Sequence, residues 1–215
     1  AVLLKEARDE GDTITVVALD DGLAEVEQML YTAAAKGVDR LVRITDVPPG
    51  LSTSGAASLL GSFLGDGDFD AVFTGVQSAE DRDGQLAGML GHELDVPNVC
   101  VITGVDVDGD ELVVEKEFSG GVTATYAVDT PAVLGIQAAS EPPRYVAVSQ
   151  IRRVMRSAEI ETVDAADLGA PAEPGSDVVG LHEPERGGEA EMLTGSPEEA
   201  AAALADVLAD HGMEV

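Results

Sequence analysis

The sequence predicts an α/β fold: an open, mostly parallel, Rossmann-like sheet with an antiparallel hairpin insertion and an extended C-terminal arm. Three observations predict it. Runs rich in Val, Ile and Leu alternate with stretches of helical periodicity in the first half of the chain. Short strand-like runs separated by Gly and Asp then follow one another closely. Finally, four of the ten prolines fall between residues 171 and 197.

The first half is expected to alternate helix and strand. The segment "TITVVALDD" is a nearly continuous β-branched run of the kind that a parallel sheet buries on both faces. Ser52 or Thr53 can cap the helix that follows the Pro48-Pro49 pair. The expected elements are a helix over 1–11, a strand over 13–21, a helix over 23–37, a strand over 38–44, a helix over 52–64, a strand over 69–75 and a helix over 84–94.

The second half changes character. Residues 99–137 contain four short strand-like runs, separated by turn residues, that fit antiparallel hairpins. The last run, "AVLGIQ", is apolar enough to return to the central sheet. We therefore expect a Rossmann-like α/β domain over residues 1–160 and an arm without a core of its own over residues 161–215.

The arm is expected to end in a helix at about residues 197–211. Ser196 is the expected N-cap, Pro197 takes the first helical position, and Glu199 completes a capping box. Such a helix, beyond a segment without a core, docks either on the first domain or on a partner chain.

The charge balance excludes some classes of partner. The chain has 41 Asp and Glu residues against 12 Lys and Arg residues, which gives a formal net charge of −29. Such a surface repels nucleic acids and anionic membranes. Because the chain also has regular apolar runs, we interpret the balance as that of a folded protein from a high-salt cytoplasm. Cys100 is the single cysteine, and no run reaches the roughly 18 apolar residues of a membrane span. A cytoplasmic protein without membrane insertion is expected.

No group of residues predicts catalysis or metal binding. His92, His182 and His211 are scattered and lack acidic or cysteine neighbours at metal-ligand spacing. The chain has no G-x-S-x-G elbow, and paired carboxylates carry little information in so acidic a chain. We therefore expect no catalytic residue and no metal ligand.

The segment "GVQSAEDRDGQLAGML", residues 75–90, has the outline of a nucleotide-binding turn. It follows a strand and opens a helix, whose N-terminal N–H groups suit a phosphate. The loop also carries Glu80, Asp81 and Asp83, which are expected to point to solvent or to hold the loop by local hydrogen bonds. An equally strong interpretation is that the small residues merely allow tight packing of the helix on the sheet.

A basic segment interrupts the acidic chain. "PPRYVAVSQIRRVMRSA", residues 142–158, contains four arginines and no acid. The arginines either pair with the acidic body of the protein or contact a partner. In the second case the donors are Arg144, Arg152, Arg153 and Arg156, and the apolar contacts are Tyr145, Val148, Ile151 and Met155.

These segments resemble one family. "GVQSAEDRDGQLAGML" resembles the nucleotide-binding loop of the β subunit of electron transfer flavoproteins, where a strand-ending Gly-x-Gln-x precedes an acidic loop and a helix-opening Gln. "SEPPRYVAVSQIRRVMRS" is similar to the family's stretch after its last sheet strand. "GDELVVEKEFSGGVTATYAVDTPAVLGI" looks like the hairpin between them, and the three together cover most of residues 1–165 in the correct order.

The resemblance implies a non-catalytic electron-carrier subunit. Family members pair with an α subunit that holds most contacts to a redox-active FAD, while the β subunit binds a second adenine nucleotide. The heterodimer takes electrons from acyl-CoA and other dehydrogenases and passes them to a quinone oxidoreductase. For this chain the resemblance implies AMP or a second FAD as its own ligand, on a fold like that of adenine nucleotide α hydrolases.

Two sets of site residues follow from the resemblance. The implied nucleotide-binding residues are Ala18, Leu19, Gly75, Val76, Gln77, Ser78, Asp83, Gly84, Gln85, Leu86 and Ala87. The implied partner-binding residues are Arg144, Tyr145, Val148, Ile151, Arg152 and Met155. Val148 stands at the position of a protruding apolar anchor for dehydrogenases, and the C-terminal arm is expected to embrace the α subunit.

The chain departs from the family pattern in three places, one of which is the basic helix, diluted after Arg156 by Glu159 and Glu161. The family begins with a strand and a long loop before the helix found here at residue 1, so the resemblance implies that the first strand is missing from this sequence. Where AMP-binding members carry Asn-Gln-Thr-Gly, this chain has Gly84-Gln85-Leu86-Ala87. This difference favours a resemblance to members related to the nitrogen-fixation branch. Two other classes share the fold: a stand-alone adenine-nucleotide sensor similar to universal stress proteins, and an enzyme of the adenine nucleotide hydrolase kind.

Overall fold

The computed structural model describes residues 1–8, 11–22, 25–65, 67–78, 81, 83–109, 111–139, 141–172, 175, 179–184, 190 and 192–213. The chain divides into two compact units, Ala1–Asp177 and Val178–Val215. Each unit is described by itself.

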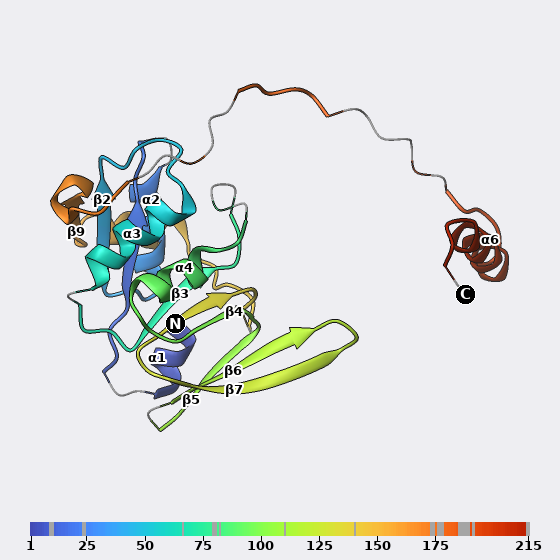
Figure 1. The fold of residues 1–215 in the computed structure, drawn as a ribbon, viewed down its shortest axis with the longest axis horizontal. Coiled ribbons are helices and arrows are strands. Elements are labelled where there is room, and N and C mark those ends of the chain that lie inside the picture. Colours follow the sequence, from blue (N-terminus) through green and yellow to red (C-terminus); the bar gives the residue numbers. More distant parts are fainter. Residues whose placement is uncertain are drawn as a thin grey trace. The chain divides into compact units, whose positions relative to one another are not determined.

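Among the described residues, the first unit contains all the strands and most of the helices (Figure 1). In chain order its elements are α1 (Val2–Arg8), β1 (Thr15–Leu19), α2 (Val26–Ala35), β2 (Arg40–Thr45), α3 (Thr53–Leu64), β3 (Ala71–Gly75), α4 (Leu86–Glu93), β4 (Asn98–Ile102), β5 (Gly104–Asp108), β6 (Glu111–Phe118), β7 (Val122–Asp129), β8 (Ala132–Ile136), α5 (Val148–Val154), β9 (Ile160–Asp164) and the 3-10 turn η1 (Ala165–Leu168).

Six strands form two parallel sheets of three. One sheet has the order β1-β2-β9 and the other the order β3-β8-β4, and every pairing in them is parallel. The mixed α/β class with mostly parallel, open sheets is thereby confirmed. The strands that were expected to form one sheet are in two, with β1 and β3 each at an edge.

Helix α3 packs against both parallel sheets. Its Leu59 lies in a buried cluster with Ile44 of β2, and its Ala57 lies in another with Val133 of β8 and residues of α4. Leu60 packs against both clusters. Ser52 begins the helix as expected, because its hydroxyl oxygen accepts the Gly55 N–H at 2.9 Å. One helix therefore joins the two sheets on this face.

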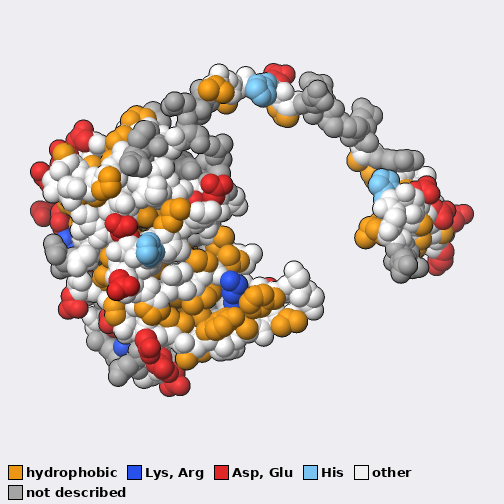
Figure 2. All heavy atoms as spheres, viewed as in Figure 1, with side chains coloured by type: hydrophobic (Ala, Val, Ile, Leu, Met, Phe, Trp, Pro, Cys, Tyr) orange, Lys and Arg blue, Asp and Glu red, His pale blue; other side chains and the backbone are white. Residues whose placement is uncertain are grey.

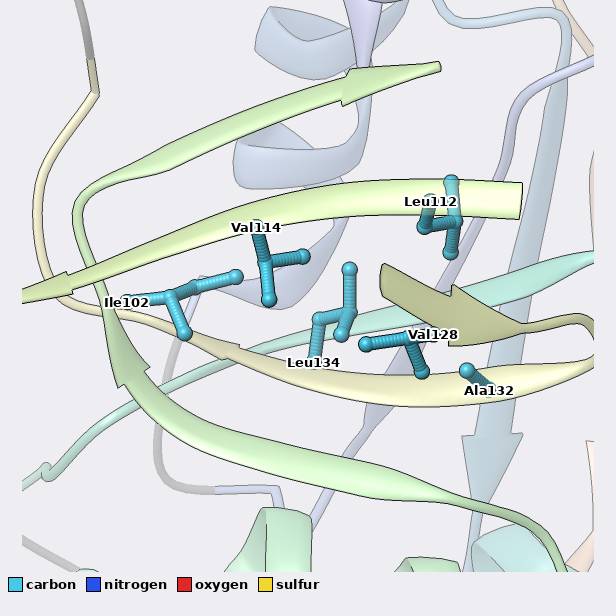
Figure 3. Packing of buried hydrophobic residues seen from close by; sticks show 6 residues of the cluster. All are labelled: Ile102, Leu112, Val114, Val128, Ala132 and Leu134. Carbon is cyan, nitrogen blue, oxygen red and sulfur yellow. The ribbon is translucent and has the colours of Figure 1, made fainter. Parts of the chain in front are cut away.

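Different elements cover the opposite faces. Helix α2 covers the first sheet, where Val26 and Leu30 pack on Leu41 of β2. The antiparallel sheet β5-β6-β7 covers the second sheet. Figure 3 shows this core, in which side chains of the hairpin meet those of β4 and β8; the buried members are Ile102, Leu112, Val114, Val128, Ala132 and Leu134.

The structure corrects the expected pairing of residues 99–108. This run was expected to belong wholly to antiparallel hairpins, but it divides at Thr103 into β4, which pairs parallel with β8, and β5, which pairs antiparallel with β6. The ladder shifts register between Cys100 and Ile102, and Val101 has a φ of 63°. This local irregularity lets one extended run serve two sheets. The run "AVLGIQ" returns to the parallel sheet as β8, as expected.

Two boundaries also differ. Helix α2 begins at Val26, and not at residue 23 as expected, after Glu25, which makes no side-chain cap; residues 23 and 24 lie outside the described residues. The arm was expected from residue 161, but β9 pairs with β2 over its whole length, and the first unit extends to Asp177. Ile160 packs beneath α2, and Val163 packs in the core with Ile44, so this segment is held by burial.

The second unit contains helix α6 (Pro197–Asp210). The expected capping box is confirmed, because Glu199 N–H donates to the Ser196 hydroxyl at 3.3 Å and Ser196 N–H donates to the Glu199 carboxylate at 2.8 Å. Leu204 and Val207 of its apolar face are exposed.

For residues 1–215 by themselves, we expect the free edges of β1 and β3 to exchange backbone amide hydrogens faster than β2 and β8, because an edge strand is hydrogen-bonded on one side only. Amides of β2 and β8 should be protected at least about tenfold more strongly. Hydrogen–deuterium exchange followed by mass spectrometry or NMR measures this. Equal protection of β1 and β2 would show that something pairs with the free edge in solution.

Candidate functional site

The segment after β3 lies at the carboxyl end of a parallel sheet. Gly75 is the exposed last residue of the strand, and ten residues, the last of them the cap residue Gln85, separate it from the start of α4. A Cβ added at Gly75 meets no atom within 4 Å. In open α/β sheets this edge is where ligands bind, and an open backbone position suits close approach of a ligand.

Asp81 holds the loop together. Its carboxylate accepts the N–H groups of Gln85 and Leu86 at 3.2 and 3.1 Å, and it accepts the Thr53 hydroxyl at 3.0 Å. Its own N–H donates to the Ser78 hydroxyl at 2.9 Å, and its carbonyl oxygen accepts the Ser78 N–H at 3.2 Å. One acidic side chain thus caps α4 and joins the loop to the first turn of α3.

This arrangement changes the interpretation of the acidic loop. Asp81 fixes loop geometry by local hydrogen bonds, one of the two roles expected for these acids. However, it accepts two N–H groups at the start of α4, the groups that were expected to hold a phosphate. Asp83 is exposed, and Glu80 lies outside the described residues.

Two glycines allow the close packing seen here. Gly84 has a φ of +66°, and a Cβ there would stand 2.9 Å from the carbonyl oxygen of Val76, so a larger residue would strain the loop. Gly135 of β8 lies against Ala87 of α4, where an added Cβ would be 3.2 Å from the Ala87 Cβ. The packing interpretation of the small residues therefore has direct support here.

The remaining predicted nucleotide-binding residues divide by burial. Gln77, Ser78 and Gln85 are exposed, whereas Leu86 is half-buried. At the end of β1, Ala18 packs towards α2 and Leu19 packs towards α3.

A cavity that sequence reasoning missed lies beyond the ends of β1, β2 and β9. It has a volume of about 600 Å³, and its lining includes Asp20, Asp21, Arg43, Asp46 and Thr162. The Arg43 Nη1 is 2.5 Å from a carboxylate oxygen of Glu27, and its Nε is 3.5 Å from one of Asp20. The sequence signal that could have located this cavity is the set of acidic residues directly after β1 and β2, namely Asp20, Asp21 and Asp46. Its acidic lining suits hydroxyl groups or cations better than phosphates.

The basic segment forms the exposed start of α5 and the loop before it. Tyr145 and Val148 are 88% and 61% exposed, and Met155 is also exposed. Ile151 is half-buried, whereas Arg152 is exposed. The exposed side chains of this segment therefore include the arginines Arg152, Arg153 and Arg156 as well as apolar residues.

Arg144 shows the alternative role that was considered for the arginines. Its guanidinium donates to both carboxylate oxygens of Glu6 on α1, one of them at 2.8 Å. The hydrogen bond from Arg144 lowers the pKa of the Glu6 carboxyl and raises the pKa of Arg144. Because both groups are exposed, the pair contributes little to stability, but it occupies Arg144 within the molecule.

Comparison with known proteins relates this chain, with its Rossmann-like fold, to one family. The electron transfer flavoprotein domain matches residues 1–168. Electron transfer flavoprotein subunit beta of Methylophilus methylotrophus is 29% identical over 217 residues, covering 97% of this chain and 81% of that protein. The protein of the same name from Homo sapiens is 29% identical over 188 residues, covering 86% and 71%. That from Bacillus subtilis is 29% identical over 216 residues, covering 97% and 80%.

The chain belongs to the electron transfer flavoprotein family, and the resemblance to its β subunits is confirmed. Membership implies a role in electron transfer and an α-subunit partner. Among the described residues, no helix combines the length and the apolar character that crossing a bilayer requires.

We expect Asp81→Ala to destabilise the first unit by about 1–2 kcal/mol, because α4 loses its cap and Thr53 loses its acceptor. Asp81→Asn keeps one acceptor oxygen and should cost less. Asp83→Ala is the matched control and should change the free energy of unfolding by less than about 0.5 kcal/mol. Denaturant unfolding measures all three. Equal stability of Asp81→Ala and Asp83→Ala would contradict the capping role.

Proposed function

We propose that this chain is the non-catalytic β subunit of a heterodimeric electron transfer flavoprotein. The observation that carries the proposal is the family match over residues 1–168, which includes the β3–loop–α4 segment and the hairpin. The subunit covers an FAD that the α subunit mainly holds. The heterodimer takes electrons from dehydrogenases of the acyl-CoA type and passes them to a quinone oxidoreductase.

The proposed ligand of this subunit is an adenine nucleotide, either AMP or a second FAD. We place it beyond the carboxyl end of β3, against the open backbone at Gly75 and the exposed Gln77. Asp81 then holds the loop in shape rather than binding the phosphate. The side-chain donors of the AMP-binding pattern are absent at Gly84 and Leu86, which favours contacts through the backbone.

A further parallel strand is proposed between β1 and β3. Two observations support it: each of these strands is paired on one side only, and Leu60 of α3 packs against the clusters of both sheets. β1 is also only half-buried, although its apolar run is of the kind that a sheet buries on both faces. The added strand joins the two sheets and closes the side of the nucleotide site.

The contact with dehydrogenases is proposed at the start of α5. Val148 and Tyr145 are the exposed apolar side chains there, and exposed apolar residues of this size commonly mark partner sites. The working compartment is proposed to be a cytoplasm of high salt, because a net charge of −29 needs screening at close range between subunits. If the chain were a stand-alone sensor or a hydrolase, the hairpin and the arm would have no role.

Co-expression with the α subunit in molar salt should give a yellow heterodimer. Denaturing it should release FAD and, from this subunit, either AMP or more FAD, which mass spectrometry identifies and quantifies against protein. A colourless chain that remains monomeric beside a folded α subunit would refute the proposed function. A yellow heterodimer that contains one FAD per pair and no other nucleotide would refute the ligand proposed for this subunit, but not the proposed function.

Replacing Val148 by Ala should slow flavin reduction by a dehydrogenase about tenfold, because an exposed anchor loses its contact with the partner. The flavin content should remain unchanged. Ser149→Ala, at the exposed neighbouring position, is the matched control. Stopped-flow absorbance of the flavin measures the rate. Equal rates for the two variants would remove Val148 from the contact with dehydrogenases.

A further inference from the structure

The antiparallel sheet has one face that is buried at one end and exposed at the other. Along β6 and β7 this face carries the register pairs Leu112–Val128, Val114–Tyr126, Lys116–Ala124 and Phe118–Val122. Leu112, Val114 and Val128 are buried in the core. Phe118 is 45% exposed, Val122 58% and Tyr126 41%. The hairpin therefore carries its core face beyond the sheet that covers it, and Figure 1 shows β6 and β7 extending past that sheet.

The exposed part is a two-stranded ribbon. Strand β5 pairs with β6 only as far as Glu115, so residues 116–118 have β7 as their one neighbour. The ribbon is closed by Gly120 and Gly121, which have φ values of 82° and 74° that other residues rarely adopt. An isolated ribbon of two strands is marginally stable in water. Burial of its apolar face against another surface would stabilise it.

The two faces of the ribbon differ in charge. The face towards solvent carries Glu115, Glu117, Thr123 and Thr125. The apolar face carries no acid among its described residues, and Lys116 lies on it with Nζ 5.6 Å from the centre of the Phe118 ring. Figure 2 shows hydrophobic side chains gathered over this hairpin. In a chain with a net charge of −29, an exposed face without acids is the surface best suited to a close contact.

We propose that this apolar hairpin face, made of Lys116, Phe118, Val122, Ala124 and Tyr126, docks on the α subunit. The proposal rests on the proposed function and names the surface that the subunit uses. The matching surface on the α subunit is apolar and presents a carboxylate to Lys116.

A permanent partner fits this face better than a transient one. Exposed aromatic and β-branched residues next to the core resemble the interfaces of obligate complexes. The surface proposed for dehydrogenases is separate, because α5 packs with α2 beside the first parallel sheet whereas the hairpin packs on the second. The α subunit can therefore stay bound while dehydrogenases exchange.

A second copy of this chain fits poorly. In a two-fold contact through this face, Lys116 of each copy would lie against the same apolar face of the other copy, which carries no acid to pair with it. It also brings two chains of charge −29 together. A partner of different sequence avoids both costs.

The test compares two variants of one hairpin. Phe118→Thr with Val122→Thr puts a Thr–Thr pair on the apolar face, and Glu117→Thr, opposite Thr123, puts the same pair on the solvent face. We expect the first variant to raise the Kd for the α subunit by about tenfold or more, and the second by less than about twofold. Titration in molar salt measures Kd, and thermal unfolding of each isolated chain confirms that both variants fold.

A second measurement covers the case in which the double variant unfolds. The chain has no Trp, so Phe118→Trp supplies a single reporter on the apolar face. Its emission should move to shorter wavelength on addition of the α subunit, because contact removes water from the indole. Unchanged emission together with a flavin-containing heterodimer overturns the docking and leaves the proposed function intact.

Two further outcomes are decisive. If the wild-type chain does not bind the α subunit, both the proposed function and the docking fail. If sedimentation shows a homodimer of the wild-type chain that the Phe118 and Val122 substitutions abolish, the face belongs to a second copy, and the docking on the α subunit is overturned.

Discussion

Packing of α3 across two parallel sheets is the constraint on which the first unit depends. β1 and β3 do not pair with one another, so the sheets are held together through the side chains of this helix and the layers around it. Leu59 is completely buried and Leu60 contacts both clusters. Loss of this burial separates the two sheets, because each sheet alone has only three strands. The start of the same helix, at Thr53, receives the loop that carries Asp81.

Burial, rather than charge pairing, decides what is firmly held in this protein. Helix α1 has no buried residue and is tied by ion pairs, Lys5 with Asp39 at 2.6 Å and Glu6 with Arg144. Exposed pairs of this kind contribute little and weaken further in salt. By contrast β8 lies between two layers and is almost wholly buried. The acidic surface therefore adjusts solubility and association, while the apolar clusters hold the fold.

The proposed functional surfaces lie on different elements of this frame. The candidate nucleotide loop follows β3, the exposed Val148 begins α5, and the apolar hairpin face extends from β6 and β7. Each is attached to a buried layer at one end, which keeps its position while leaving its own side chains open. A carrier that holds one partner and exchanges others needs such separate surfaces.

Local signals in the sequence predicted the α/β class, most of the elements and two helix starts. The caps at Ser52 and Ser196 depend on neighbouring residues only, and so they could be predicted from short segments. The candidate loop could be located from its glycines and the strand before it. The family resemblance rested on the same kind of local pattern.

The sequence by itself therefore determined which segments become strands and helices and where a candidate ligand loop follows a strand, because those features depend on residues close in the chain. Only the tertiary structure decided what Asp81 binds, that β9 pairs with β2, and that Glu6 occupies Arg144. These contacts join residues far apart in the sequence or select one of many carboxylates. In a chain with 41 acids, the partner of any one acid is settled by position in space.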